Sequence, residues 1–160
     1  MIVADVMTKE VATCRPETNL AAASALMWEN DCGALPVLAD TGEVAGMLTD
    51  RDICIALGTR DRRSSEVTAR EAAATHALVC KPKDDIGRAL QIMQDARIRR
   101  LPVVDEDGAL KGIVSIGDIV LSVRGGFARQ GFSVSPKDVL AALQAIYTCD
   151  APVSGESAAA

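Results

Sequence analysis

The chain contains one motif string twice, at a fixed spacing of 66 residues and without a gap. Residues 33–53 read GALPVLADTGEVAGMLTDRDI, and residues 99–119 read RRLPVVDEDGALKGIVSIGDI. The similarity extends over residues 14–57 and 80–123, where these identical pairs fall in register: Cys14/Cys80, Pro16/Pro82, Met27/Met93, Leu35/Leu101, Pro36/Pro102, Val37/Val103, Gly42/Gly108, Gly46/Gly112, Asp52/Asp118 and Ile53/Ile119. A fixed period predicts two copies of one supersecondary unit.

Each copy predicts the element order β-α-β-β-α. In the first copy, residues 11–14 indicate a strand and residues 18–30 a helix, because Leu20, Ala23 and Met27 recur at helical spacing behind a cap at Thr18 or Asn19. Two strands around the turn at 40–43 and a helix that ends before Gly58 complete the unit. The second copy predicts the same elements at 78–80, 84–96, 101–105, 110–115 and from about 116.

This duplicated string resembles the tandem cystathionine β-synthase (CBS) domain pair, or Bateman module. The resemblance rests on the run Leu-Pro-Val, an acidic turn that ends in Gly, and Gly-x-x-Thr/Ser-x-x-Asp, all present in both copies. It implies an α/β (α+β) fold with pseudo-two-fold symmetry. We expect the first repeat at 1–60 and the second at 61–124, then a C-terminal loop and amphipathic helix at 125–150 and a disordered tail at 151–160.

The sequence outside the two repeats contains fewer signals of secondary structure. The connection is polar, and the alanines of segment 66–74 favour a helix there without deciding it. After Val123, Phe127 and Phe132 are expected to pack back onto the body. Residues 135–138 have the form of a capping box with Pro at the first helical position, which predicts that a helix begins here. The apolar residues that follow would form a stripe along one face of this helix.

The composition of the chain limits the classes of molecule that it is expected to bind. A formal net charge of -5 argues against a general nucleic-acid or membrane binder, and no run of 18 apolar residues occurs, so we expect a soluble, cytoplasmic protein. The five cysteines lack a C-x-x-C pair and are expected to be reduced and buried. A single histidine, His76, supports neither a zinc site nor a catalytic triad.

Two tetrapeptides, 49–52 and 115–118, lie where a strand meets a helix. Free backbone N–H groups at a helix start attract phosphate, the hydroxyl of Thr49 or Ser115 adds a ligand, and Asp52 or Asp118 can accept hydrogen bonds from a ribose. The same spacing is also that of a helix N-cap, so both interpretations stay open. In CBS pairs these positions commonly contact phosphate and ribose.

The copies differ at the positions before Leu-Pro-Val, where the second has Arg99 and Arg100 and the first has Gly33 and Ala34. The resemblance implies that the arginines reach phosphates, although a solvated pair is the alternative. We expect them to share a pocket with Asp118. Arg51 is a further candidate for binding the ligand, and the equivalent position in the second copy is Gly117. The resemblance adds positions near the start of each repeat: Lys9, Thr13, Thr75 and Val79.

The sequence therefore predicts a regulatory protein and not an enzyme. By resemblance, it binds an adenine nucleotide such as AMP, ADP or ATP, forms a homodimer through its helices, and passes the signal to an unidentified effector protein. The alternative is a ligand-free dimerising scaffold in which both Thr/Ser-x-x-Asp motifs cap helices and do nothing else.

Overall fold

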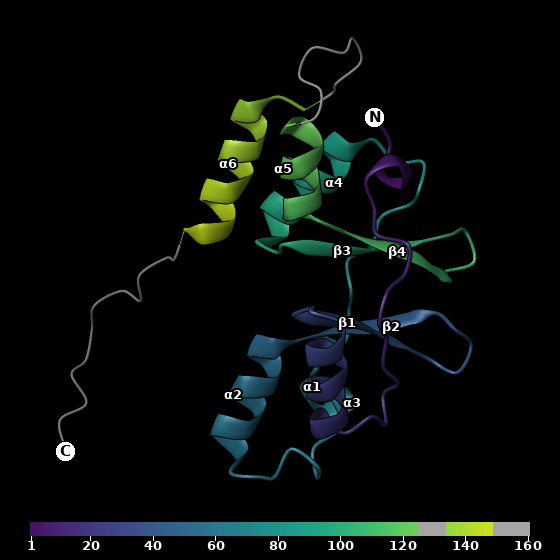
Figure 1. Cartoon of the computed structure of the whole chain (residues 1–160), viewed down its shortest axis with the longest axis vertical. Coiled ribbons are helices and arrows are strands. Elements are labelled where there is room, and N and C mark those ends of the chain that lie inside the picture. Colours follow the sequence, from purple (N-terminus) through teal and green to yellow (C-terminus); the bar gives the residue numbers. More distant parts are fainter. Residues whose placement is uncertain (125–133, 149–160) are drawn as a thin grey trace, which may run out of the picture.

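The computed structural model describes residues 1–124 and 134–148, and it arranges them as two hairpins between two helical layers (Figure 1). The antiparallel pair β1 (Ala34–Leu38) and β2 (Val44–Thr49) carries α1 (Leu20–Glu29), α2 (Asp50–Arg60) and α3 (Ala69–Ala72) on its outer side. The pair β3 (Arg100–Val104) and β4 (Leu110–Ser115) carries α4 (Ile86–Ala96), α5 (Ile116–Arg124) and α6 (Pro136–Tyr147). The predicted mixed α/β class is confirmed.

The first strand expected in each copy is reduced to one bridging residue. The Cys14 N–H donates to the Pro36 carbonyl (3.1 Å) and the Leu38 N–H donates to the Cys14 carbonyl (2.9 Å), and Cys80 repeats this bridge on Val103. A longer parallel ladder would need N–H groups at Pro16 and Pro36, which proline lacks. Pro82 and Pro102 impose the same limit in the second copy. The predicted strands at 11–14 and 78–80 are therefore wrong.

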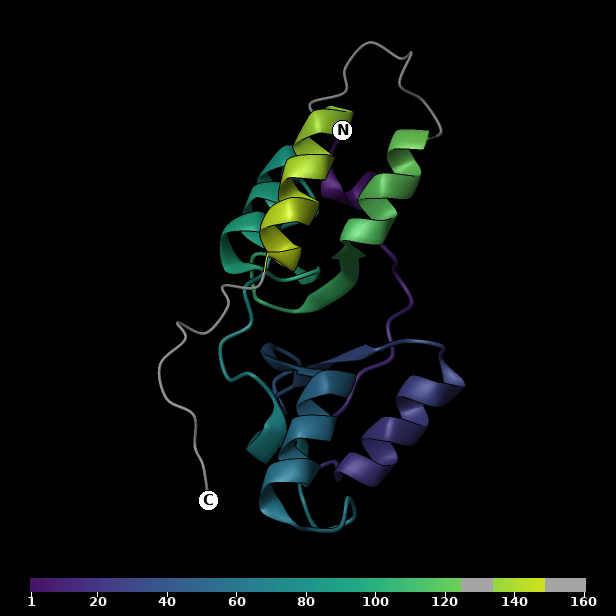
Figure 2. The ribbon, with the colours of Figure 1, turned by 90° about the vertical axis from the view of Figure 1, so that its left-hand side faces the viewer.

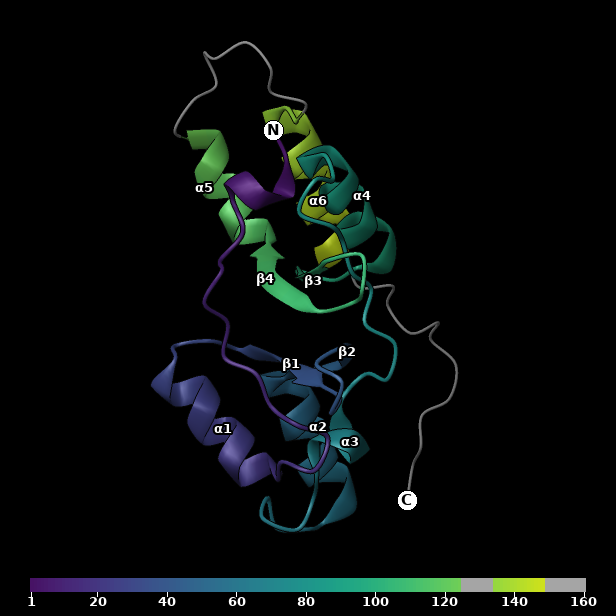
Figure 3. The same ribbon diagram turned by 90° about the vertical axis from the view of Figure 1, so that its right-hand side faces the viewer.

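The two repeats exchange short segments. The short 3-10 helix η1 (Val3–Asp5) belongs to the second core, where Val3 is fully buried, and Thr8 pairs with Ile113 of β4. Figure 3 shows the N-terminal segment passing from beside α5 to the first repeat. In turn, Val67 and Ala69 are buried in the first core. The expected boundary at residues 60 and 61 thus divides the sequence repeats, whereas the cores interlock across it.

The exchanged segments explain the glycine of the repeated Gly-x-x-Thr/Ser motif. A Cβ atom on Gly46 would lie 2.3 Å from the carbonyl oxygen of Ala74, and one on Gly112 would lie 2.6 Å from that of Thr8. Contacts this short do not occur for real side chains, so both positions need glycine for close approach of the backbones. Gly42 and Gly108, which also occupy equivalent positions of the two copies, end the hairpin turns with positive φ angles of 86° and 81° that favour glycine.

Helix ends follow the predicted caps with one exception. The Asn19 side chain accepts from the Ala22 N–H at the start of α1, and the Ser135 capping box with Pro136 begins α6 as predicted. Helix α2, however, does not end before Gly58. It continues to Arg60 and ends at Asp61 in the left-handed conformation (φ 47°), because one exposed glycine costs a helix about 1 kcal/mol and the buried Ile53 and Ala56 hold it to the core.

Cys14 and Cys80 lie in the two cores, and burial raises the pKa of their thiols to about 11 and about 12. These two match the prediction of buried, reduced cysteines, and Cys32 is half-buried and free. Cys54 is exposed, which corrects the prediction for that residue. Cys149, Phe127, Phe132 and the tail at 151–160 lie outside the described residues.

No helix in the ranges 1–124 and 134–148 has both the length and the apolar character needed to cross a membrane.

Candidate functional site

A cavity of about 660 Å³ lies between the two repeats. From the first repeat it takes Ala34 and Met47 of the hairpin and Thr49, Arg51 and Asp52 from the start of α2. From the second it takes the segment before Cys80 and the turn that joins α4 to β3, including Arg99 and Arg100. Six of the predicted site residues are therefore brought together: Ala34, Thr49, Arg51, Asp52, Arg99 and Arg100.

The Thr49-x-x-Asp52 motif forms a complete capping box. The Asp52 N–H donates to Thr49 Oγ1 (3.2 Å), while the Thr49 N–H and hydroxyl both donate to Asp52 Oδ2 (2.9 and 2.6 Å). The capping interpretation of this motif is thus confirmed. Because all three bonds leave out Oδ1, the carboxylate keeps a second oxygen with which a bound hydroxyl group can interact.

Other N–H groups at this helix start are paired as well. The Asp50 N–H donates to the Gly33 carbonyl (3.2 Å), and the Arg51 N–H donates to Asp50 Oδ1 (2.7 Å). The expectation that free backbone donors await a phosphate here is therefore wrong. Recognition of an anion in this cavity falls to side chains, and the arginines are the residues that can supply it.

The basic side chains come from both repeats. Arg51 lies on α2, Arg97 is the left-handed C-cap of α4 (φ 53°), and Arg99 and Arg100 lead into β3. With His76 neutral, the four arginines and Asp52 give the lining a formal charge of +3. In a cavity with partly apolar walls, such a concentration of charge favours anionic ligands.

Gly33 lies close to this cluster. A Cβ atom there would stand 2.9 Å from Asp50 Oδ2 and 3.8 Å from Nη2 of Arg100, so the missing side chain leaves room for both groups. Ala34 lines this cavity, whereas Gly33 itself lines a smaller hollow on the outside of the first repeat. Arg100 reaches across from β3 to the chain that enters β1.

The second motif has the same cap in a different setting. The Ser115 N–H and hydroxyl donate to Asp118 Oδ2 (2.8 and 2.7 Å), and the Asp118 N–H donates to Ser115 Oγ (3.1 Å). Neither residue lines the 660 Å³ cavity, so the arginines share it with Asp52 and not, as expected, with Asp118. At the twin positions, 66 residues away, Arg51 is replaced by Gly117, Arg97 by Asp31 and His76 by Glu10. The two sites have therefore diverged in charge.

The remaining candidates lie near the cavity in the chain. Thr75 and Val79 belong to the segment that supplies Ala74, His76, Ala77 and Leu78, but they are not in its lining, and neither are Lys9 and Thr13. Sequence reasoning missed His76, Arg97, Ile146 and Tyr147. For Arg97 the sequence did contain a signal, because the equivalent position in the first copy is the oppositely charged Asp31. For Ile146 and Tyr147 there was none, because they lie beyond the repeats.

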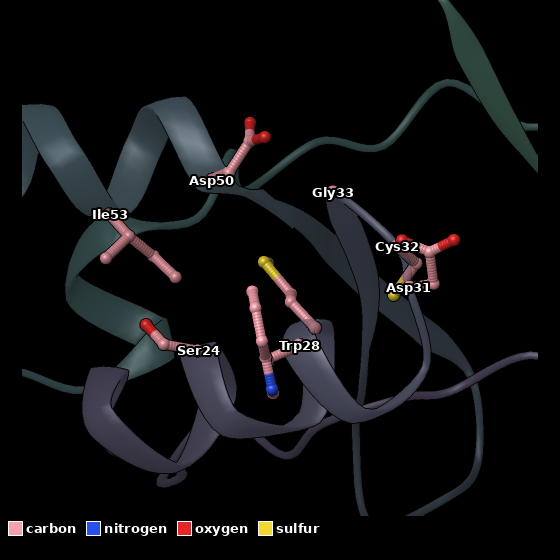
Figure 4. Close-up of a pocket in the computed structure, with 8 residues that line it drawn as sticks. Ser24, Trp28, Asp31, Cys32, Gly33, Asp50 and Ile53 are labelled. Atoms are coloured by element: carbon pink, nitrogen blue, oxygen red, sulfur yellow. The ribbon is translucent and has the colours of Figure 1, made fainter.

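A second hollow of about 420 Å³ lies between α1 and α2 on the outside of the first repeat (Figure 4). Ser24 and Trp28 of α1 face Ile53 and the start of α2 across it, and Trp28 is 88% exposed. The equivalents of Ser24 and Ile53 in the second repeat, Leu90 and Ile119, are buried in the core that α6 completes with Val139 and Ala142, and the equivalent of Trp28 is the half-buried Gln94. Helix α6 therefore covers in the second repeat what stays open in the first.

Comparisons with known proteins give the class of this chain. The sequence model of the CBS domain matches residues 3–59 and 69–125, and the chain belongs to the CBS-domain family as a tandem pair. The CBS domain-containing protein YhcV of Bacillus subtilis is 38% identical over 120 residues, which span 75% of this chain and 84% of YhcV.

Solved structures agree with the fold. A putative signal-transduction protein with CBS domains from Burkholderia ambifaria superposes with a TM-score of 0.71 at 30% identity, covering 84% of this chain and 100% of that one. The CBS domain pair of protein MJ0100, in complex with 5'-methylthioadenosine and S-adenosyl-L-methionine, superposes with a TM-score of 0.72 at 22% identity over 78% of this chain and 97% of that one.

Proposed function

We propose that this CBS pair is a non-enzymatic regulatory protein that binds an adenine nucleotide, AMP, ADP or ATP, in the cavity between its repeats. The observation that carries the proposal is the meeting, in one 660 Å³ cavity, of the Asp52 carboxylate with four arginines from both repeats. Asp52 Oδ1 would accept from the ribose, and Arg99, Arg100 and Arg51 would bind the phosphates. The adenosyl ligands of MJ0100 support an adenosine-containing ligand.

The lining charge separates this proposal from the ligands of MJ0100. S-adenosylmethionine carries a positive sulfonium and methylthioadenosine carries no phosphate, so neither gains from a lining of formal charge +3. Affinity should rise from adenosine to AMP and again to ATP. A panel of these five compounds in titration calorimetry and thermal unfolding tests this order. At about 100 times its dissociation constant, a ligand should stabilise the fold by roughly 2.7 kcal/mol.

The Arg100→Ala variant sharpens the test. Losing hydrogen bonds to a charged group costs about 1.5–3 kcal/mol, so ATP affinity should fall roughly 10- to 150-fold while adenosine affinity stays the same. If no compound in the panel binds or raises the melting point, the nucleotide proposal fails. The alternative of a ligand-free scaffold, in which both motifs only cap helices, then gains support.

We further propose that the chain forms a homodimer through α1 and α2 of the first repeat. The exposed residues of α1 are mostly small or apolar: Ala21, Ala22, Ser24, Ala25, Trp28 and Glu29. In the second repeat, α6 covers the surface that corresponds to the hollow beside them. A second copy is the occupant we expect. Light scattering should give twice the 16.8 kDa chain mass for the parent and the single mass for Trp28→Arg, and a monomeric parent at micromolar concentration would contradict the dimer.

A further inference from the structure

The cavity between the repeats has one wall that belongs to neither repeat. Ile146 and Tyr147 line it, and both lie in the last turn of α6, beyond residue 125 where the second CBS match ends. Figure 2 shows the C-terminal end of α6 at the level of the β3–β4 hairpin, above the start of α2. Residues outside the duplicated unit thus contribute to the site.

Helix α6 is firmly held by the second repeat. Its Ser135–Asp138 capping box fixes one end, Val139 and Ala142 are buried in the second core, and Leu143 and Ile146 pack against that core. At the other end, the Thr148 N–H and hydroxyl both donate to the Gln144 carbonyl (2.9 and 2.6 Å). Tyr147 is therefore presented by a packed and capped helix, which orients its ring at low entropic cost.

The charges of the cavity decide which part of a nucleotide meets this wall. The carbonyl end of α6 carries partial negative charge, which disfavours phosphate. The arginines belong to other elements, namely α2 and the segment from the end of α4 to the start of β3. The last turn of α6 offers the aromatic ring of Tyr147, 62% exposed, and the aliphatic side chain of Ile146. These groups suit a planar, uncharged base.

From this arrangement, and on the basis of the proposed nucleotide site, we infer that the last turn of α6 is the base-binding wall and that the Tyr147 ring stacks on the purine. Because Ile146 both packs on the second core and lines the cavity, a bound base stabilises the docked position of α6. Helix α6 is then the element that reports occupancy of the site.

The test uses the full-length chain with Tyr147→Ala, Tyr147→Phe and Leu140→Ala. Base stacking on an aromatic side chain is worth about 1–3 kcal/mol, so Tyr147→Ala should weaken the binding of ATP and of adenosine alike by roughly 5- to 150-fold. Inorganic triphosphate, which has no base, should compete for the site equally well in the parent and in Tyr147→Ala. Tyr147→Phe keeps the ring and should therefore retain the affinity that Tyr147→Ala loses. Leu140 is exposed on the same helix outside the cavity lining, so Leu140→Ala is the control that should bind like the parent.

The outcomes separate this inference from the proposal beneath it. A parent protein that binds no nucleotide overturns the proposed function and the inference with it. A parent that binds ATP, together with a Tyr147→Ala variant that binds it equally well, overturns the inference alone. Because Tyr147 is largely exposed, its replacement should leave the unfolding midpoint unchanged, and urea unfolding of each variant verifies that affinity is compared between equally folded proteins.

Discussion

Replacing Asp52 and Asp118 by alanine separates ligand binding from helix capping. Each carboxylate accepts two hydrogen bonds through Oδ2 in its capping box, at 2.9 and 2.6 Å for Asp52 and at 2.8 and 2.7 Å for Asp118. Because the caps are equivalent, Asp52→Ala and Asp118→Ala should each lower the free energy of unfolding by about 1 kcal/mol. In a domain of this size that shifts the melting point by about 2–4 °C.

The affinities should differ where the stabilities agree. Asp52 lines the arginine-rich cavity and has Oδ1 outside its cap, so Asp52→Ala should also weaken ATP and adenosine by about 1.5–3 kcal/mol, or roughly 10- to 150-fold. Asp118→Ala should bind both like the parent. Urea unfolding and titration calorimetry on the same preparations measure the two effects. An Asp52→Ala protein with parental affinity, or equal losses in both variants, would refute the assignment of the site to Asp52.

Two further predictions concern the fold. Gly46→Ala should lower the free energy of unfolding by about 1–3 kcal/mol or more, because the new Cβ would meet the Ala74 carbonyl oxygen. Gly58→Ala should raise the free energy of unfolding by about 0.5–1 kcal/mol, because Gly58 lies in a helix and nothing stands within 4 Å of its Cβ position. If urea unfolding does not give changes of opposite sign, the close-approach argument is wrong. Burial raises the pKa of the Cys80 thiol to about 12, so above about pH 8.5 the thiol loses its proton in the unfolded state before it does so in the folded state. The free energy of unfolding should therefore fall by about 1.4 kcal/mol per pH unit for this one thiol, up to about pH 12. Between pH 8 and pH 10.5 the free energy of unfolding should fall less in Cys80→Ala than in the parent, and an equal fall in both proteins would contradict the prediction.

The hairpins and most helix starts could be predicted because their signals are local. Strand alternation around Gly42 and Gly108 and the caps at Asn19 and Ser135 act over a few residues, and the structure has them where the sequence indicates. The strands expected at 11–14 and 78–80 failed for a reason that was legible in principle. One proline on each of the two paired segments removes an N–H group that a longer ladder needs, but this effect can be predicted only when it is known which residues pair.

The composition of the site was harder to predict, because it depends on contacts between distant segments. The repeat pattern paired Arg99 and Arg100 with Asp118, their neighbour in the same copy, whereas the interlocked fold places them beside Asp52 of the other copy. No periodicity in the sequence indicates which copy faces which. The same limit hid Ile146 and Tyr147, whose position follows from the packing of α6 on α4 and α5.

The two copies of the duplicated unit share residues that each needs to fold, and they differ in residues that line the cavity between them and in the corresponding positions of the other copy. The caps, the close-approach glycines and the buried cysteines occur in both copies. The arginines and the last turn of α6 belong to one inter-repeat cavity, while the acidic Glu10 and Asp31 take the twin positions of His76 and Arg97. Similarly, α6 covers the helices of the second repeat and leaves the α1–α2 surface of the first open. A nucleotide in that cavity would contact Arg51 and Asp52 at the start of α2 as well as the end of α6, whereas a second copy on the α1–α2 surface would contact α2 beside Ile53. The proposed ligand and the proposed dimer contact would then share helix α2, and each could influence the other through it.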